Sequence, residues 1–164
     1  MKDILVIAGS NGSHSINQWF AQKLGEIENV DYLDTRTLNL PYYCMDIEET
    51  TGIPQEIIAL HETIKKYSKL IIVSPEYNSF APAFLKSMHD WLSRHERFYL
   101  EGIDLILVAV TPGKKAGAST REMLNTLFGL ANANVVGSYG IADFNYDNDY
   151  TKEIAEIMKI FSKK

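Results

Sequence analysis

The chain has 164 residues, of which 46% are hydrophobic and 23% charged, ordinary values for one globular domain spanning residues 1–164. The formal net charge is -5, which excludes the strong positive field of a protein that binds nucleic acid or an anionic membrane surface. The single cysteine, Cys44, cannot form an intramolecular disulfide, and no signal segment or bilayer-length apolar run is present, so we expect a cytoplasmic protein.

Short apolar runs alternate along the chain with segments of helical spacing. The apolar runs predict buried strands over Ile4–Ala8, Val30–Asp34, Leu70–Ser74, Ile103–Val110 and Val135–Gly140. Apolar residues at helical intervals predict helices over Ile16–Ile27, Pro54–Tyr67, Ala81–Ser93, Ser119–Ala131 and Thr151–Phe161. Ser15 is the expected N-cap of the first helix, and Arg36–Thr51 is expected to be an irregular surface loop.

Strands that alternate with helices predict an α/β fold with a parallel sheet and helices on both of its faces. Five strands joined by right-handed crossovers favour the strand order 2-1-3-4-5, which is a flavodoxin-like three-layer α/β/α sandwich. In such an open sheet, ligands bind beyond the carboxyl ends of the strands, where the strand order reverses. The loops that follow the first, third and fourth strands of this predicted sheet are therefore candidates for a binding site.

The first loop, residues 9–17, is rich in glycine and serine and leads into a helix. Helix N-termini present unpaired N–H groups and a partial positive charge, which favour a phosphate group. The hydroxyl groups of Ser10, Ser13 and Ser15 suit the same ligand, while a polar turn with a serine cap is the alternative interpretation. The loop matches neither a Walker motif nor the Gly-x-Gly-x-x-Gly pattern of dinucleotide-binding proteins.

The second loop, residues 74–82, combines a carboxylate, an aromatic ring and an amide in Glu76, Tyr77 and Asn78. A planar heteroaromatic ligand with nitrogen and oxygen atoms along its edge requires this mixture of groups. The alternative is a turn whose tyrosine packs on the protein itself.

The third loop, residues 111–118, contains Gly113 and Gly117, which allow the backbone to turn tightly beside a ligand. Lys114 and Lys115 lie between them and are able to face a phosphate group. Two adjacent lysines are more often simply solvated.

These motifs resemble those of the NADPH-dependent FMN reductase family, which includes FMN-dependent azoreductases and quinone reductases. The first loop is similar to the family's Gly-Ser-x-Arg-x-x-Ser-x-Asn phosphate motif at Gly9, Ser10, Ser15 and Asn17. The second loop and its helix are similar to the family's Pro-Glu-Tyr-Asn … Pro-Gly-x-Leu-Lys-Asn … Asp-Trp segment. The matching residues there are Pro75, Glu76, Tyr77, Asn78, Pro82, Leu85, Lys86, Asp90 and Trp91.

The resemblance implies that the chain binds FMN, with its phosphate at the first loop and its isoalloxazine ring along the second. The cofactor-binding positions implied in this way are Ser10, Gly12, Ser15, Asn17, Pro75, Glu76, Tyr77, Asn78 and Gly113. Two residues depart from the family pattern, because Gly12 stands where the family usually has arginine and Ala83 stands where it usually has glycine. A lost charge-assisted hydrogen bond is worth about 1.5–3 kcal/mol, so the sequence leaves open whether FMN binds weakly or is lost.

The function implied by the resemblance is transfer of electrons from NADPH or NADH, through FMN, to a flavin, quinone, azo compound or similar small acceptor. Because the flavin carries this chemistry, we expect no catalytic side chain and no metal site. A flavodoxin-type electron carrier is one alternative, although the first loop lacks the Thr/Ser-x-Thr-Gly-x-Thr motif of such carriers. A flavin-free binding or regulatory module is another. The resemblance also implies a homodimer or homotetramer.

Overall fold

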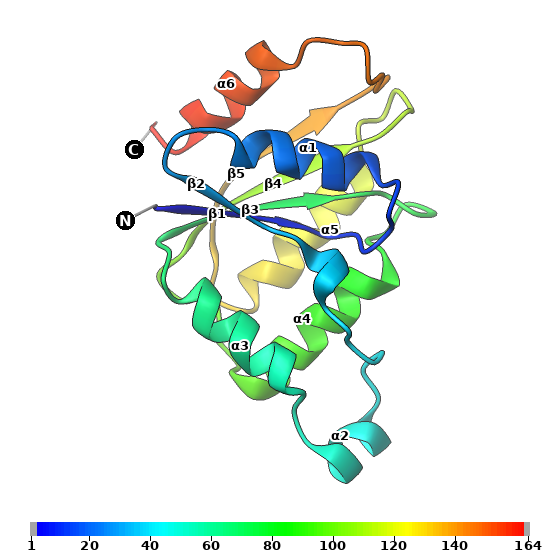
Figure 1. Cartoon of the computed structure of the whole chain (residues 1–164), viewed down its shortest axis with the longest axis vertical. Coiled ribbons are helices and arrows are strands. Elements are labelled where there is room, and N and C mark those ends of the chain that lie inside the picture. Colours follow the sequence, from blue (N-terminus) through cyan, green and yellow to red (C-terminus); the bar gives the residue numbers. More distant parts are fainter. Residues whose placement is uncertain (1–2, 163–164) are drawn as a thin grey trace.

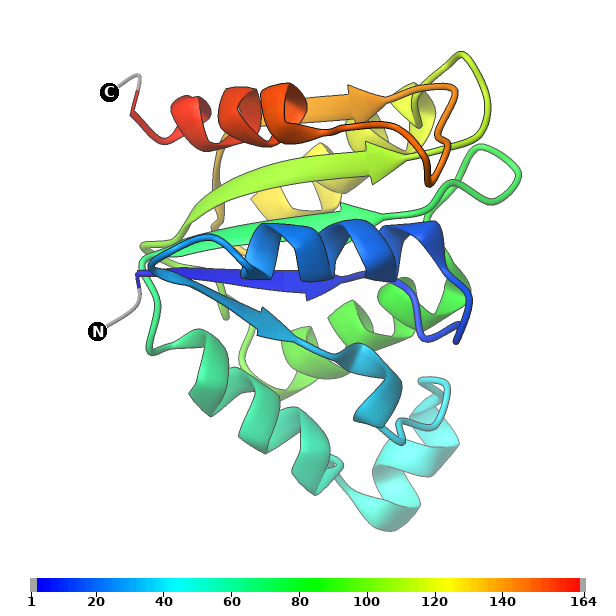
Figure 2. The same cartoon turned by 45° about the horizontal axis from the view of Figure 1, so that its top comes forward.

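The computed structural model describes residues 3–162, in which five parallel strands form one sheet of order β2-β1-β3-β4-β5. The strands are β1 (Ile4–Ala8), β2 (Val30–Leu33), β3 (Lys69–Ser74), β4 (Asp104–Val110) and β5 (Asn134–Ile141). The strand order predicted from the sequence is confirmed. In Figure 2 the arrowheads of the strands point toward one end of the molecule, where the candidate loops lie.

Helices cover both faces of this sheet (Figure 1). The helices on one face are α1 (Ile16–Gly25) and α6 (Thr151–Ile160), and those on the other are α3 (Gln55–Ile64), α4 (Ala83–His95) and α5 (Ala118–Gly129). Each face has its own apolar cluster, with Phe20 and Ile157 buried in the first and Ile57, Trp91 and Phe128 in the second. Within residues 3–162, no helix has the length and hydropathy needed to cross a bilayer.

The segment between β2 and α3 is more ordered than the sequence predicts. The expectation of an irregular loop is wrong for the short helix α2 (Met45–Thr51) and for the 3-10 turn η1 (Thr35–Thr37). Helix α2 buries none of its residues, so hydrophobic periodicity could not reveal it. Its Glu48 carboxylate accepts hydrogen bonds from Tyr43 Oη and from Arg94 Nε, both at 2.9 Å, and its partly buried Ile47 packs against the core.

Helix α4 anchors the chain that precedes α2. Its Trp91 is fully buried and donates from Nε1 to the carbonyl oxygen of Pro41 at 2.9 Å. One turn earlier, Ser87 Oγ accepts a hydrogen bond from the Tyr43 N–H at 2.7 Å. Trp91 therefore packs inside the subunit, and α4 fixes a segment that has little regular structure of its own.

His89, also on α4, makes the stability of the fold depend on pH. It is buried against Phe128, and its Nδ1 lies 2.9 Å from Tyr99 Oη. Burial lowers the pKa of His89 from its ordinary 6.5 to about 4. Below pH 6.5 the unfolded chain therefore binds a proton that the folded chain does not, and folding loses about 1.4 kcal/mol per pH unit down to pH 4.

We therefore expect the free energy of unfolding to fall by about 2 kcal/mol between pH 7 and pH 5 through this residue. Urea titrations at both pH values, run on the wild-type protein and on His89→Asn, isolate the histidine from the carboxyl groups that titrate nearby. The variant should show a smaller loss than the wild-type protein. Equal losses in the two proteins would assign the pH dependence to other groups.

Candidate functional site

Three loops meet at the carboxyl edge of the sheet, at the right of Figure 2. They line a cavity of about 240 Å³. The sequence predicts that these three loops lie close together. The lining residues are His14, Ser15, Ile16, Asn17, Pro75, Glu76, Tyr77, Val110, Thr111 and Pro112. The first loop, the second loop and the end of β4 with the third loop all contribute to it.

The first loop ends in a helix N-terminus that offers free hydrogen-bond donors to the cavity. Ser15 is the N-cap, as predicted, and its Oγ accepts the Gln18 N–H at 3.4 Å. The N–H groups of Ile16 and Asn17 lie in the first turn of α1, where a helix supplies no carbonyl partner, and no other acceptor within residues 3–162 reaches them. Together with the helix dipole they favour an anion.

The side chain of Asn17 is used inside the protein. It is buried, donates from Nδ2 to the Val110 carbonyl oxygen at 2.9 Å and accepts the Val110 N–H at Oδ1 at 3.1 Å. Strand β3 pairs with β4 only as far as Ser74 and Ala109, so Asn17 takes the place of the missing neighbour at Val110. This pair of bonds fixes the start of α1 against the end of β4, and it leaves the backbone N–H of Asn17 to face a ligand.

Ser10 lies beneath the first loop and does not line the cavity. It is buried, and its carbonyl oxygen accepts hydrogen bonds from Gln18 Nε2 and from Thr35 Oγ1, the latter at 2.8 Å. Its Oγ accepts the Gly12 N–H at 3.3 Å, which shapes the turn. Glycine at position 9 allows the loop to pass close to α4, because the Cβ of any other residue there would lie 2.7 Å from Leu85 Cδ2.

The second loop forms a tight hairpin that projects from the edge. Tyr77 and Phe80 exchange two backbone hydrogen bonds of 2.9 and 3.0 Å, and Asn78 and Ser79 between them both have positive φ, the pattern of a type I′ turn. Tyr77 is 57% exposed and Phe80 63% exposed. The alternative in which the tyrosine packs on the protein is therefore wrong: Tyr77 lines the cavity and is largely exposed.

Glu76 connects the second loop to α5. Its Oε2 accepts the Thr120 N–H at 3.0 Å, in the first turn of that helix. A carboxylate is favourable at this position because the helix N-terminus carries a partial positive charge. Glu76 therefore lines the cavity and also joins two of the three loops.

The third loop turns into α5 through two residues with left-handed backbone, Ala116 and Gly117. A fourth segment, residues 142–150, supports it: the Phe144 N–H donates to the carbonyl oxygen of Thr111 at 3.1 Å. Phe144 stacks on Tyr150 with ring centroids 5.4 Å apart. No sequence motif marked this segment, although its density of aromatic residues is visible in the sequence.

Five of the nine expected positions line the cavity, namely Ser15, Asn17, Pro75, Glu76 and Tyr77. The other four, Ser10, Gly12, Asn78 and Gly113, belong to the same loops without lining it. His14, which was not among the expected positions, also lines the cavity and is the basic side chain among the lining residues. Unpaired N–H donors beside exposed aromatic rings fit a ligand that has both an anionic group and a flat ring.

Comparisons with known proteins identify relatives of this chain. A family model described as NADPH-dependent FMN reductase matches residues 2–147. The chain is 30% identical over 161 residues to the "Uncharacterized protein MG342 homolog" of Mycoplasma pneumoniae, covering 95% of this chain and 96% of that protein. It is 28% identical over 137 residues to a quinone reductase of Escherichia coli, covering 81% of this chain and 72% of the other.

Solved structures show the same fold. FerB, described as a flavoenzyme NAD(P)H:(acceptor) oxidoreductase from Paracoccus denitrificans, superposes with a TM-score of 0.65 at 22% sequence identity. The superposition covers 93% of this chain and 80% of that one.

Proposed function

Because the chain belongs to the NADPH-dependent FMN reductase family, we propose that the cavity between its three loops holds FMN and that a reduced nicotinamide and a small acceptor react there in turn. The observation that carries this proposal is the meeting of unpaired N–H groups, a glutamate and an exposed tyrosine in one cavity. Ser10, Gly12, Ser15, Asn17, Pro75, Glu76, Tyr77, Asn78 and Gly113 remain the proposed cofactor-binding positions.

The first loop is suited to the phosphate of FMN. The N–H groups of Ile16 and Asn17 and the Ser15 hydroxyl group supply neutral donors, and the His14 side chain supplies a basic group. Typical ligand pockets measure about 300–1,000 Å³, which exceeds the 240 Å³ found here. The cavity therefore receives one part of FMN, and the flat ring extends over the exposed surface at Tyr77.

FMN held here would supply the redox chemistry, as an acceptor of a hydride from the reduced nicotinamide and a donor of two electrons to an oxidised acceptor. The task of the protein is to bind and orient these partners. Glu76, fixed by Thr120, and Asn78, fixed in its turn, carry polar groups able to hydrogen-bond the edge of the ring. No side chain is required as an acid or nucleophile. A quinone or azo compound, flat like the ring, is the acceptor class we propose.

The direct test is the visible spectrum of the purified protein after incubation with FMN and removal of the excess. We expect a bound flavin whose absorption fades in one two-electron step when NADPH is added without oxygen. NADH in place of NADPH tests which nicotinamide donates, and a quinone added afterwards should restore the absorption.

A protein that stays colourless with excess FMN would contradict the proposal and favour the flavin-free binding module. A bound flavin that is reduced by neither NADPH nor NADH, yet accumulates a one-electron reduced form on photoreduction, would favour an electron carrier.

Replacement of Gly12 by arginine should strengthen FMN binding by about 10–100-fold, because it supplies a charge-assisted bond worth about 1.5–3 kcal/mol. The site has room, since a Cβ at Gly12 would have only ordinary contacts, 3.6 Å from Ser10 Oγ and 3.9 Å from Ser15 Cβ. Quenching of FMN fluorescence on titration gives the dissociation constant. Gly12→Gln, of similar length without charge, is the control, and equal affinities of the two variants would show that position 12 does not face the phosphate.

We propose further that the chain works as a single domain over residues 1–164, in the cytoplasm, as a homodimer or homotetramer. The exposed Cys44 suits a reducing compartment. The partners proposed are small molecules, and the negative net charge favours neither nucleic acid nor an anionic membrane surface.

A further inference from the structure

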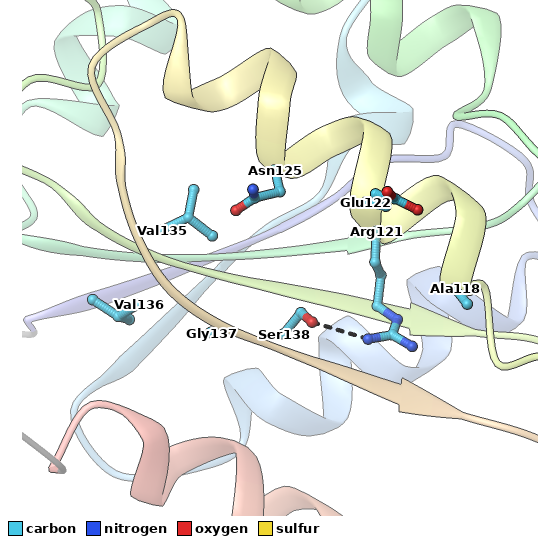
Figure 3. Close-up of a pocket in the computed structure, with 8 residues that line it drawn as sticks. All are labelled: Ala118, Arg121, Glu122, Asn125, Val135, Val136, Gly137 and Ser138. Carbon is cyan, nitrogen blue, oxygen red and sulfur yellow. Dashed lines mark hydrogen bonds between the residues drawn. The ribbon is translucent and has the colours of Figure 1, made fainter.

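A second hollow in the surface lies beside the candidate site, in the groove between α5 and β5 (Figure 3). It has a volume of about 370 Å³, and ligand pockets typically measure about 300–1,000 Å³. The groove shares no lining residue with the cavity, but it begins at Ala118, the first residue of α5, where the third loop ends. A ligand that extends along the third loop can therefore reach both.

Arg121 spans this groove, and its guanidinium group is held in place on both sides. Nη1 donates a hydrogen bond to Ser138 Oγ on β5 at 2.9 Å, and Nε donates to the carbonyl oxygen of Ala116 in the third loop at 3.3 Å. A Cβ at Gly140 would lie 2.8 Å from Nη2, so glycine at this position leaves room for the group. Within residues 3–162 these bonds use two of the five N–H donors, which leaves three for a ligand.

The positive charge of Arg121 has no close negative partner in the described part of the chain. Arg36 forms an ion pair with Asp34, whereas no carboxylate within residues 3–162 forms one with Arg121. Burial lowers the pKa of Arg121, because the half-buried group has lost part of its hydration, and the charge of Glu76 offsets part of this effect. An anion in the groove would stabilise this charge, and a guanidinium group binds a phosphate through two parallel hydrogen bonds.

The rest of the groove suits a nucleoside. The Glu122 carboxylate can accept hydrogen bonds from a sugar hydroxyl group, and the Asn125 amide can both donate and accept at the edge of a base. Val135 adds an apolar side chain across the groove from Asn125. From Ala118 to Asn125 the helix rises about 10 Å, so these groups follow Arg121 in the direction away from the third loop.

We propose that the groove binds the adenosine end of NADPH, with the 2′-phosphate on Arg121, the ribose 3′-hydroxyl group at Glu122 and the adenine toward Asn125. Because this assignment rests on the proposed function, the nicotinamide end is placed at the cavity, at the other end of the third loop. Other dinucleotide-binding proteins also accommodate the 2′-phosphate with an arginine. NADH lacks this phosphate, so Arg121 is the residue that selects NADPH.

Isothermal titration calorimetry with adenosine 2′,5′-bisphosphate and adenosine 5′-monophosphate tests the groove without any electron transfer. The two nucleotides differ only in the 2′-phosphate, so we expect the wild-type protein to bind the bisphosphate about 10–100-fold more tightly. Arg121→Gln keeps a hydrogen-bond donor but removes the charge, and it should reduce this ratio to about threefold or less. Arg121→Lys keeps the charge and should retain most of the ratio.

Arg97→Gln is the matched control, since Arg97 is exposed, lies over the Phe98 ring and does not line the groove. It removes the same charge and should keep the ratio of the wild-type protein, and circular dichroism checks that each variant folds. In turnover, Arg121→Gln should lower the preference for NADPH over NADH in kcat/KM by about tenfold or more, through a higher KM for NADPH.

Equal binding of the two nucleotides by the wild-type protein would overturn this site, as would a folded Arg121→Gln variant with the wild-type ratio. Either result leaves the proposed function standing if a nicotinamide still reduces bound FMN. A protein that selects the bisphosphate through Arg121 yet takes up no FMN would support the groove and contradict the proposed function.

Discussion

Replacement of Gly117 by alanine should lower the free energy of unfolding by about 3 kcal/mol, through two separable costs. Gly117 has a φ of 63°, a left-handed backbone that costs an L-residue about 1 kcal/mol or more. A Cβ there would also lie 2.4 Å from the Cβ of Ala109, on β4, so the third loop must move away from the sheet. Overpacking of this kind costs about 1–3 kcal/mol.

Gly102→Ala is the matched control for this change. Gly102 has a φ of 78°, but a Cβ there would meet no atom within 4 Å, so only the backbone cost of about 1 kcal/mol applies. Urea unfolding of both variants measures the difference. Equal losses would show that the approach of Gly117 to Ala109 does not restrict the third loop.

Replacement of Asn17 by alanine should lower the free energy of unfolding by about 3–4 kcal/mol, because two backbone groups of Val110 lose their partners at about 1–3 kcal/mol each. The start of α1 is then no longer fixed to the end of β4. We also expect FMN binding to weaken about tenfold or more, since one misplaced phosphate contact is worth about 1.4 kcal/mol or more.

Asn39→Ala serves as the control, because Asn39 is exposed and lies outside the cavity. Its change in unfolding free energy should stay within about 0.5 kcal/mol. Urea unfolding and FMN fluorescence titration give the two quantities. If Asn17→Ala kept the stability of the wild-type protein, Val110 would have to find other partners, and the proposed role of Asn17 would be wrong.

The sequence predicted the sheet because burial on both faces leaves a continuous apolar run, as in β1. It missed α2 because that helix buries no residue fully, and its contacts are with distant parts of the chain: Ile47 packs against the core, and Glu48 accepts a hydrogen bond from Arg94, 46 positions away. Local patterns contain no information about such distant partners. The boundaries of the other elements differ by a few residues because the ends of helices depend on caps and loops.

The site was predicted less completely than the fold, for a similar reason. The motifs mark three loops, and the structure brings Ser15, Glu76 and Tyr77 from two of these loops to one cavity. The motif match at Asn17 does not show that its side chain is hydrogen-bonded to the backbone of Val110, 93 positions away. Glu76 likewise accepts a hydrogen bond from the backbone N–H of Thr120, 44 positions away. Both pairings arise only when the strands lie side by side.

The hairpin at the second loop has a consequence for how tightly a ligand binds. Asn78 and Ser79 hold left-handed backbone conformations, each of which costs about 1 kcal/mol or more in a residue other than glycine. Because the two bonds between Tyr77 and Phe80 fix this geometry as the chain folds, little conformational entropy is left to lose when a ring docks. The second loop is thus preorganised, and its affinity for flat molecules should depend on shape more than on induced fit.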